Sequence, residues 1–152
     1  MARCSINRYP QVVGVIASRA DLERAVRMRR PPDLFELRLD RLAGLTDQVE
    51  NLLPKLRTPL IITARHPHEG GASKLRLRDR RDLLARFLNH AAYMDVELRS
   101  ARALRSLLNL AARKKVRRII SFHNFNTTPS VQNLVSEGAR GEIPWRRCFQ
   151  SC

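Results

Sequence analysis

Five short apolar segments, four of which end in polar residues that share one strand face, constrain the fold of this chain more than any other feature. The segments span residues 11–17, 33–40, 59–65, 93–98 and 117–123. Successive side chains of a strand point to opposite faces. An ordinary parallel strand in an α/β protein is apolar on both faces. Strands that are apolar on one face and polar on the other near their C-terminal ends therefore indicate a barrel with a polar mouth.

The polar residues fall on the same face in one segment after another. Glu36, Arg38 and Asp40 share a face of the second segment. The later segments contribute three further pairs: Thr63 with Arg65, Asp95 with Glu97, and Ser121 with His123. In a (β/α)8 barrel the active site lies at the C-terminal ends of the strands. We therefore expect these side chains to converge on one site.

Amphipathic stretches separate the five segments. Apolar residues recur at helical spacing in residues 21–30, 46–56, 73–92 and 100–111, and Thr46 and Ser100 are expected to cap two of these helices. Residues 128–130 resemble the start of a further helix, with proline near its first turn. Alternating strands and helices with short links predict parallel βαβ units with right-handed crossovers.

The length of 152 residues sets the expected extent of the fold. A complete (β/α)8 barrel typically needs at least about 200 residues. We therefore predict an α/β fold that is a partial (β/α)8, or TIM, barrel of about five parallel βα units over residues 1–138. Residues 139–152 show neither helical nor strand periodicity, and we expect an irregular, poorly ordered tail there.

The net charge of +15 raises the possibility of a nucleic-acid partner. However, the basic residues are spread over several predicted helices, and the chain has only two tyrosines and one tryptophan as stacking platforms. We expect a solvated basic surface, with no specific nucleic-acid binding and only weak, salt-sensitive association.

The metal-binding and targeting signals in the sequence are weak. Cys4, Cys148 and Cys152 lack a second ligand pair for zinc and are expected to be reduced thiols. His66 and His68 stand in a loop without a partner ligand, and we expect both to be exposed. No apolar run approaches about 18 residues, and no signal peptide is recognisable. The sequence therefore predicts a cytoplasmic protein without a metal or a membrane partner.

Two pairs of charged residues, Glu36 with Arg38 and Asp95 with Glu97, can each be interpreted in two ways. Glu36 and Arg38 could hold the vicinal hydroxyls of a ligand, or they could form a structural ion pair inside the barrel mouth. Asp95 and Glu97 resemble a pair of catalytic carboxylates, but compensation of the neighbouring arginines is the favoured interpretation.

His123 is the favoured acid/base candidate because imidazole titrates near neutral pH. It ends the fifth segment and is expected to converge with Glu36, Arg38, Arg65 and Glu69. Arg65 could bind a carboxylate or a hydroxyl, and Glu69 could orient the imidazole.

Taken together, these motifs resemble the type I 3-dehydroquinate dehydratases, (β/α)8-barrel enzymes of the shikimate pathway. The resemblance runs from about Val12 to Leu134. It is carried by Glu36-Leu37-Arg38-Leu39-Asp40, Thr63-Ala64-Arg65 with Glu69-Gly70-Gly71, Asp95-Val96-Glu97-Leu98, and Ser121-Phe122-His123-Asn124-Phe125 with Thr128-Pro129-Ser130.

The resemblance implies dehydration of 3-dehydroquinate to 3-dehydroshikimate through an imine with an active-site lysine, without any cofactor or metal. By motif, His123 would be the general acid/base and Glu69 would position it. Glu36, Arg38 and Arg65 would bind the substrate. The family also suggests a homodimer.

One departure from the family pattern affects the expected activity. The family places its imine-forming lysine on the sixth strand, after the histidine motif, whereas the lysines of this chain are Lys55, Lys74, Lys114 and Lys115. We therefore expect a truncated family member without the Schiff-base lysine, inactive alone. The alternatives are a basic protein that binds nucleic acid or an acidic partner, and another Schiff-base barrel enzyme such as an aldolase, which also needs a lysine at a strand end.

Overall fold

A computed structural model describes residues 10–72, 74–128, 130–132 and 136. The predicted tail over residues 139–152 lies outside the described residues, as does part of the helix expected from residue 128 onward. The predicted domain boundary at residue 138 therefore stays a prediction.

The five predicted strands form one parallel sheet in the order β1-β2-β3-β4-β5. Their bounds are β1 (Val13–Ile16), β2 (Leu34–Arg38), β3 (Leu60–Thr63), β4 (Tyr93–Glu97) and β5 (Arg117–Ser121). The register aligns Arg38 with Thr63 and Thr63 with Asp95. The predicted α/β class and parallel pairing are thus confirmed, and the polar strand ends meet on one side of the sheet.

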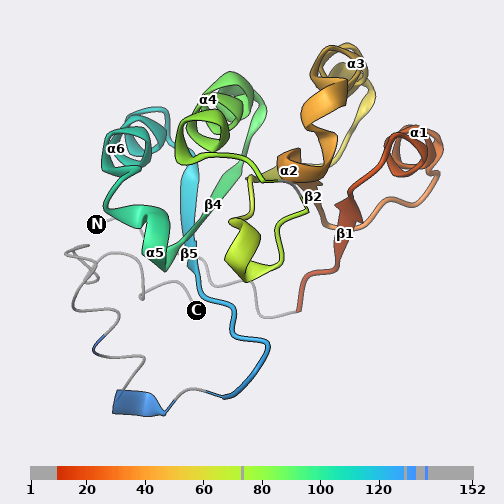
Figure 1. The fold of residues 1–152 in the computed structure, drawn as a ribbon. Helices are drawn as coiled ribbons and strands as arrows, with labels where there is room; N and C mark the ends of the chain where they lie inside the picture. Colours follow the sequence, from red (N-terminus) through yellow and green to blue (C-terminus); the bar gives the residue numbers. More distant parts are fainter. Residues whose placement is uncertain (1–9, 73, 129, 133–135, 137–152) are drawn as a thin grey trace, which may run out of the picture.

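The helices cover one face of this sheet (Figure 1). The α-helices are α1 (Arg19–Arg27), α2 (Leu39–Leu42), α3 (Thr46–Leu52), α4 (Leu77–Phe87), α5 (Leu98–Ala101) and α6 (Arg105–Arg113). Single 3-10 turns extend or join them: η1 (Ala43–Leu45), η2 (Leu53–Lys55), η3 (Pro67–Glu69) and η4 (Leu88–His90). The short helices α2 and α5 follow directly on β2 and β4, so the chain turns sharply at the end of each of these two strands.

The two predicted caps are wrong, because both hydroxyls bind arginine side chains instead. Thr46 is the first residue of α3, and its Oγ1 accepts a hydrogen bond from Arg86 Nη1 at 3.0 Å. Ser100 lies inside α5, and its Oγ accepts from Arg80 at 3.2 Å. One side chain that does cap a helix is that of Ser18, which accepts from the backbone N–H of Asp21 at the start of α1.

The hydrophobic core lies between the sheet and the helices. The strand residues that point toward the helices are 0–3% exposed, namely Phe35, Leu37, Ile62, Met94 and Val96. They pack in one cluster with helix residues such as Leu22, Leu84 and Phe87. Burying a side chain of this size contributes about 1.5–3 kcal/mol. The opposite, inner face of the sheet is thereby left for the polar side chains.

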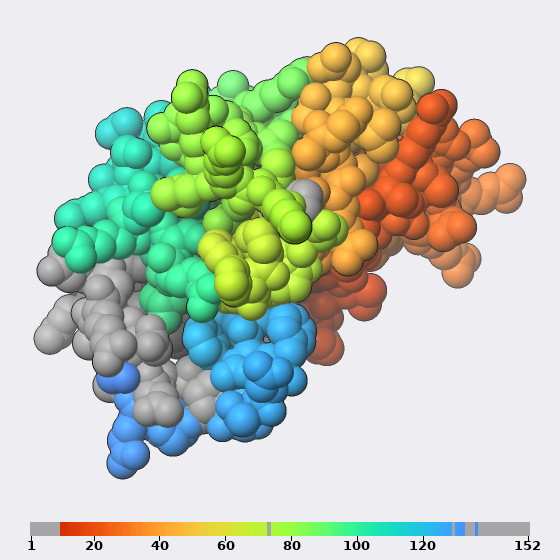
Figure 2. Space-filling model, in the orientation of Figure 1, coloured from red at the N-terminus to blue at the C-terminus, as the bar shows by residue number. Residues whose placement is uncertain are grey.

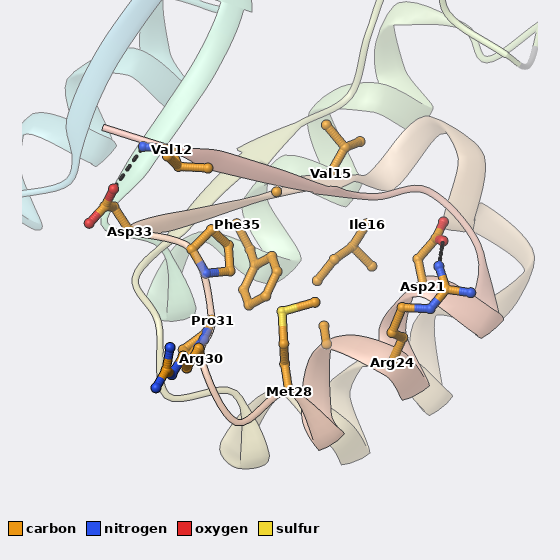
Figure 3. Close-up of a pocket in the computed structure, with 13 residues that line it drawn as sticks. Val12, Val15, Ile16, Asp21, Arg24, Met28, Arg30, Pro31, Asp33 and Phe35 are labelled. Atoms are coloured by element: carbon orange, nitrogen blue, oxygen red, sulfur yellow. Dashed lines mark hydrogen bonds and ion pairs between the residues drawn. The ribbon is translucent and has the colours of Figure 1, made fainter. Parts of the chain in front are cut away.

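An apolar groove of about 560 Å³ lies at the free side of β1 (Figure 3). Val12, Val15, Met28 and Phe35 are among its lining residues, with Asp33 at one end. The groove contains none of the predicted site residues.

Within the described part of the chain, no helix has the length and apolar character needed to cross a membrane.

Candidate active site

Arg65 lies at the centre of a polar cluster on the inner face. It follows β3 and is 6% exposed. Its guanidinium donates to Ser121 Oγ at 2.8 Å and to Asp95 Oδ2 at 3.2 Å, and it lies 3.5 Å from Glu36 Oε1. Its Nη1 is 3.2 Å from His123 Nδ1. One side chain therefore connects the ends of β2, β4 and β5, as the face pattern of the sequence predicts.

His123 and Glu69 form the second part of the cluster. Oε2 of Glu69 lies 3.2 Å from His123 Nδ1 and accepts the backbone N–H of His123 at 3.0 Å. The other carboxylate oxygen lies 3.1 Å from Arg99 Nε. Glu69 is 3% exposed, so it has little freedom to move. Figure 2 shows the yellow-green segment that contains Glu69 packed against the blue segment that contains His123.

These contacts fix the orientation of the imidazole. Nδ1 lies 3.2 Å from Glu69 Oε2 and also 3.2 Å from Arg65 Nη1, so it donates to the carboxylate when it carries the ring proton and accepts from the guanidinium when it does not. Nε2 of His123 has no hydrogen-bond partner among the described residues, and the side chain is 34% exposed. In the tautomer with the proton on Nδ1, Nε2 can accept a proton from a ligand on the inner face.

Asp40 anchors the loop that carries Glu69, a role that the sequence analysis missed. Its carboxylate accepts from Arg38 Nε at 3.0 Å and from Arg38 Nη2 at 2.9 Å. It also accepts the backbone N–H groups of Arg65 at 3.2 Å and Ala72 at 3.0 Å. Both ends of the loop are thus bound to one buried side chain. Its position on the same strand face as Arg38 was the only signal in the sequence.

Two glycines allow this loop to close tightly. Gly70 has a φ of 83°, in the left-handed region that favours glycine, and its carbonyl accepts from Arg38 Nη2 at 3.1 Å. A Cβ added to Gly71 would lie 2.3 Å from the carbonyl oxygen of Arg65. A side chain at Gly71 would therefore push the loop off the end of β3.

A buried ion pair supports the cluster from the helix side. Arg80 of α4 and Glu97 of β4 are each 1% exposed and form a salt bridge. Arg80 Nε also donates to the carbonyl of Ala64 at 2.7 Å, and Glu97 Oε1 accepts the backbone N–H of His66 at 2.7 Å. The pair therefore binds the backbone on both sides of Arg65.

The contacts show which arginine each acidic side chain of the cluster pairs with. Asp95 and Glu97 each pair with an arginine, so the expected charge compensation is confirmed. The direct pair between Glu36 and Arg38 is not formed, because Arg38 binds Asp40 and Glu36 faces Arg65.

Three other polar side chains near the cluster, those of His66, His68 and Thr63, differ in burial. His66 is half-buried rather than exposed, because its backbone is tied to Glu97. His68 is exposed, as expected. Thr63 Oγ1 is fully buried and has no hydrogen-bond partner in the described part of the chain.

The net pKa shifts of the two carboxyl groups that hold the arginines are opposite in direction. Burial alone raises the pKa of Asp40, but hydrogen bonds from Arg38, Ala72 and Arg65 outweigh it and bring that pKa below its usual value. Burial raises the pKa of Asp95 above its usual value, although Arg65 and Ser121 oppose the change.

These directions predict opposite effects of two matched substitutions. Asp40 contributes stability above its unfolded pKa of about 3.9, and that stability is lost as pH falls through its lower folded pKa. Asp40→Asn should therefore lower the free energy of unfolding at pH 7 by about 1–3 kcal/mol. The raised pKa of Asp95 means that stability falls as pH rises from about 3.9 through its folded pKa. Asp95→Asn should leave the protein equally or more stable at pH 7.

Urea unfolding between pH 2 and pH 8 measures both effects. Asp40→Asn is expected to reduce the loss of stability that the parent protein shows as the pH falls below about 3.9. Asp95→Asn is expected to remove the loss of stability that the parent protein shows as the pH rises above about 3.9. Destabilisation of the same size by both substitutions at pH 7 would contradict the assigned electrostatics.

The fold and the cluster place the chain in the (β/α)-barrel class, with polar groups at the C-terminal ends of its strands. Comparison with known proteins narrows this class. The sequence model of the type I 3-dehydroquinase family matches residues 13–141. The chain belongs to this family.

Individual relatives agree with the family match. The chain is 35% identical over 115 residues to a 3-dehydroquinate dehydratase of Pyrococcus abyssi, and 30% identical over 128 residues to one of Methanocella arvoryzae. These matches cover 70% and 84% of this chain. A solved type I 3-dehydroquinate dehydratase of Clostridium difficile, with covalently modified comenic acid, superposes with a TM-score of 0.72 at 26% identity, covering 84% of this chain.

The chain spans about half the length of the relatives it matches. The matched part is 52% of the Pyrococcus abyssi protein, 57% of the Methanocella arvoryzae protein and 56% of the solved Clostridium difficile chain. The described sheet thus corresponds to consecutive βα units of the barrel, with helices on one side and the cluster on the other.

Proposed function

We propose that the cluster is the acid/base part of a 3-dehydroquinate dehydratase site, which acts on 3-dehydroquinate to form 3-dehydroshikimate and water. The observation that carries this proposal is the contact of His123 Nδ1 with Glu69 Oε2 at 3.2 Å, beside the guanidinium of Arg65. A histidine with one nitrogen fixed and the other free is equipped to move a proton at a defined position.

Each residue has a separate role in this proposal. Nε2 of His123 removes the C2 proton of the substrate and then assists departure of the hydroxyl as general acid. Glu69 keeps the ring oriented and stabilises the imidazolium while it carries the proton. Glu36, Arg38 and Arg65 bind the polar groups of the substrate, and Asp40 holds Arg38 in place through two hydrogen bonds. Proton loss from carbon becomes feasible for an imidazole when an iminium beside it accepts the electrons.

The lysines of this chain do not fit the role of forming that iminium. Lys55 is in η2, and Lys114 and Lys115 follow α6, all three at the edge of the sheet opposite the cluster. Lys74 is exposed in the loop before α4. We therefore propose that this chain alone binds substrate without turning it over at an enzymic rate.

The partner and location that we propose follow from the same reaction. The substrate is a small polar molecule, and no cofactor or metal is invoked. We place the reaction in the cytoplasm and propose a homodimer, on the strength of the family resemblance. The barrel units are taken to form one domain that extends to residue 138.

Histidine resonances in the NMR spectrum of the chain provide a test with an internal control. The chain has four histidines, and His90 lies in η4 at the edge of the sheet away from the cluster. Adding 3-dehydroquinate should shift the ring resonances of His123 and leave those of His90 in place. Arg65→Ala should abolish the shift, whereas Arg81→Ala, at an exposed position of α4, should preserve it.

Treatment of the same samples with borohydride completes the test. We expect no stable adduct and no turnover. Equal shifts of His90 and His123 would contradict the proposed site. An adduct on one of the four lysines, with turnover that His123→Ala abolishes, would contradict the proposed inactivity of the chain alone.

A further inference from the structure

The loops that lead from each helix into the next strand lie together at the N-terminal ends of the strands, on the side of the sheet opposite the cluster. This side is called an edge of the sheet below. Backbone hydrogen bonds join them in sequence: Phe35 N–H to the carbonyl of Pro59, Ala92 N–H to that of Leu60, and Arg117 N–H to that of Ala92. Figure 1 shows the parallel strands that carry these loops. Any charge in these loops therefore adds to that of its neighbours, however far apart the residues are in sequence.

Nine basic residues gather at this edge. They are exposed and comprise Arg27, Arg29, Arg30, Lys55, Arg57, Arg113, Lys114, Lys115 and Arg117. We call this set the basic edge. None of the nine has a carboxylate within 4.0 Å in the described part of the chain, in contrast to the paired arginines of α4. The basic residues lie at the ends of separate helices, as expected, and the strand order places the loops before β2, β3 and β5 on the same side of the sheet.

The ends of the helices do not neutralise this charge. Four helical segments finish at the same edge, and a helix C-terminus carries about −0.5 charge, giving about −2 in total. Asp33 is the one acidic residue in the described loops 28–33, 53–59, 88–92 and 113–117. Against nine positive charges, these leave roughly +6 without compensation. The basic edge therefore carries more positive charge than is needed to neutralise the negative C-terminal ends of the helices.

We propose that the basic edge binds the phosphate backbone of double-stranded nucleic acid without sequence preference. Six of the nine residues are arginines, whose guanidinium groups bind phosphate oxygens in a bidentate manner. They extend from the loop before β2 to the loop before β5, which at about 4.8 Å per strand is about 14 Å. Such a span allows contact with phosphates on both sides of a duplex groove.

Two observations favour a duplex over other polyanions. Single strands are usually held by aromatic stacking, and Tyr93 is already occupied: its hydroxyl accepts from Arg117 Nη1 at 2.6 Å and that guanidinium lies 5.3 Å from its ring centroid. Attachment to an anionic membrane usually adds an inserted apolar surface. In the four described loops, Met28 is the one large hydrophobic side chain that is exposed.

The test compares two variants of the full chain that lose the same number of charges. Arg30→Gln, Arg57→Gln and Lys114→Gln remove three charges from the basic edge. Arg41→Gln, Arg102→Gln and Arg105→Gln remove three exposed arginines from segments that follow β2 and β4, near the other edge. Fluorescence anisotropy with a mixed-sequence 20-base-pair DNA duplex, between 50 and 200 mM salt, gives the affinity and its salt dependence.

The basic-edge variant should bind at least ten-fold more weakly at 100 mM salt. Its slope of log K against log salt should be smaller by about 2–3, because each lost phosphate contact removes about 0.9. The control variant should change less than three-fold. A second set, Arg27→Gln, Arg29→Gln and Lys55→Gln, should reproduce the loss, so that misfolding of one variant cannot account for it.

Three results would overturn the inference. Equal weakening in both variants would show a general effect of net charge. Preference for one duplex sequence, or binding that resists salt, would require contacts other than phosphates. Binding to phosphatidylserine vesicles that depends on the basic edge, with none to the duplex, would assign the edge to a membrane. The inference does not depend on the dehydration reaction, since the variants leave the cluster intact.

Discussion

Replacing Arg80 by leucine should lower the free energy of unfolding by about 3–5 kcal/mol, a large share of the stability of a domain of this size. The substitution leaves Glu97 buried and charged without its partner, and it frees the carbonyl of Ala64 and the hydroxyl of Ser100. A buried charge without a partner is far more costly than the loss of an exposed one. Urea unfolding monitored by circular dichroism measures the change.

Two further variants separate the buried charge from a general effect of the helix. Arg81→Leu, one position along α4, removes an exposed arginine that pairs with Asp82, and it should cost less than about 1 kcal/mol. The double variant Arg80→Met with Glu97→Leu removes both charges and should recover much of the stability. A loss below about 1 kcal/mol for Arg80→Leu alone would contradict this account.

His123→Ala should lower kcat by about 10²- to 10⁴-fold in a barrel that contains this chain, since that is the usual contribution of a general acid/base. The suitable protein is a chimera that joins residues 10–128 of this chain to the part of the Pyrococcus abyssi relative beyond the matched segment. The family resemblance places the imine-forming lysine in that part. Borohydride should therefore still trap an adduct in the His123→Ala chimera, because imine formation uses the lysine.

A matched histidine provides the control for this experiment. His68 is exposed in the same loop as Glu69, and its side chain makes no contact with His123. His68→Ala should leave kcat within about three-fold. If the His123→Ala chimera kept the kcat of the parent chimera, the proposed acid/base role would be wrong.

The arrangement of the sheet could be predicted because it depends on local patterns. Alternation of polar and apolar residues is set by the pleat of each strand, so the side of Glu36, Arg65 and Asp95 followed from parity alone. The ends of the strands could be aligned because all the strands are parallel. The contacts of Arg65 with Asp95 and Ser121 are a direct consequence.

The partners of individual charges could not be predicted, because they depend on distances between elements. Arg80 is one of the basic residues in the predicted helices, for which a solvated surface is expected, yet it is 1% exposed. Its spacing with Leu77, Leu84 and Phe87 put it on the apolar stripe, and this signal pointed to burial. The role of Asp40 required the path of the loop to Ala72, which no periodicity encodes.

The consecutive strand order has a consequence for how the molecule opens. Each strand is bonded only to its neighbours in sequence, as in a repeat protein, so stability is distributed along the sheet in one dimension. All four residues of β3 are buried, whereas those of β5 are exposed or half-buried. Local unfolding should then begin at the outer strands and reach β3 last. Arg65 therefore lies in a region that unfolds late, and His123 lies in a region that unfolds early. Local unfolding of β5 would separate the acid/base histidine from Arg65 and Glu69 while the centre of the sheet stays folded.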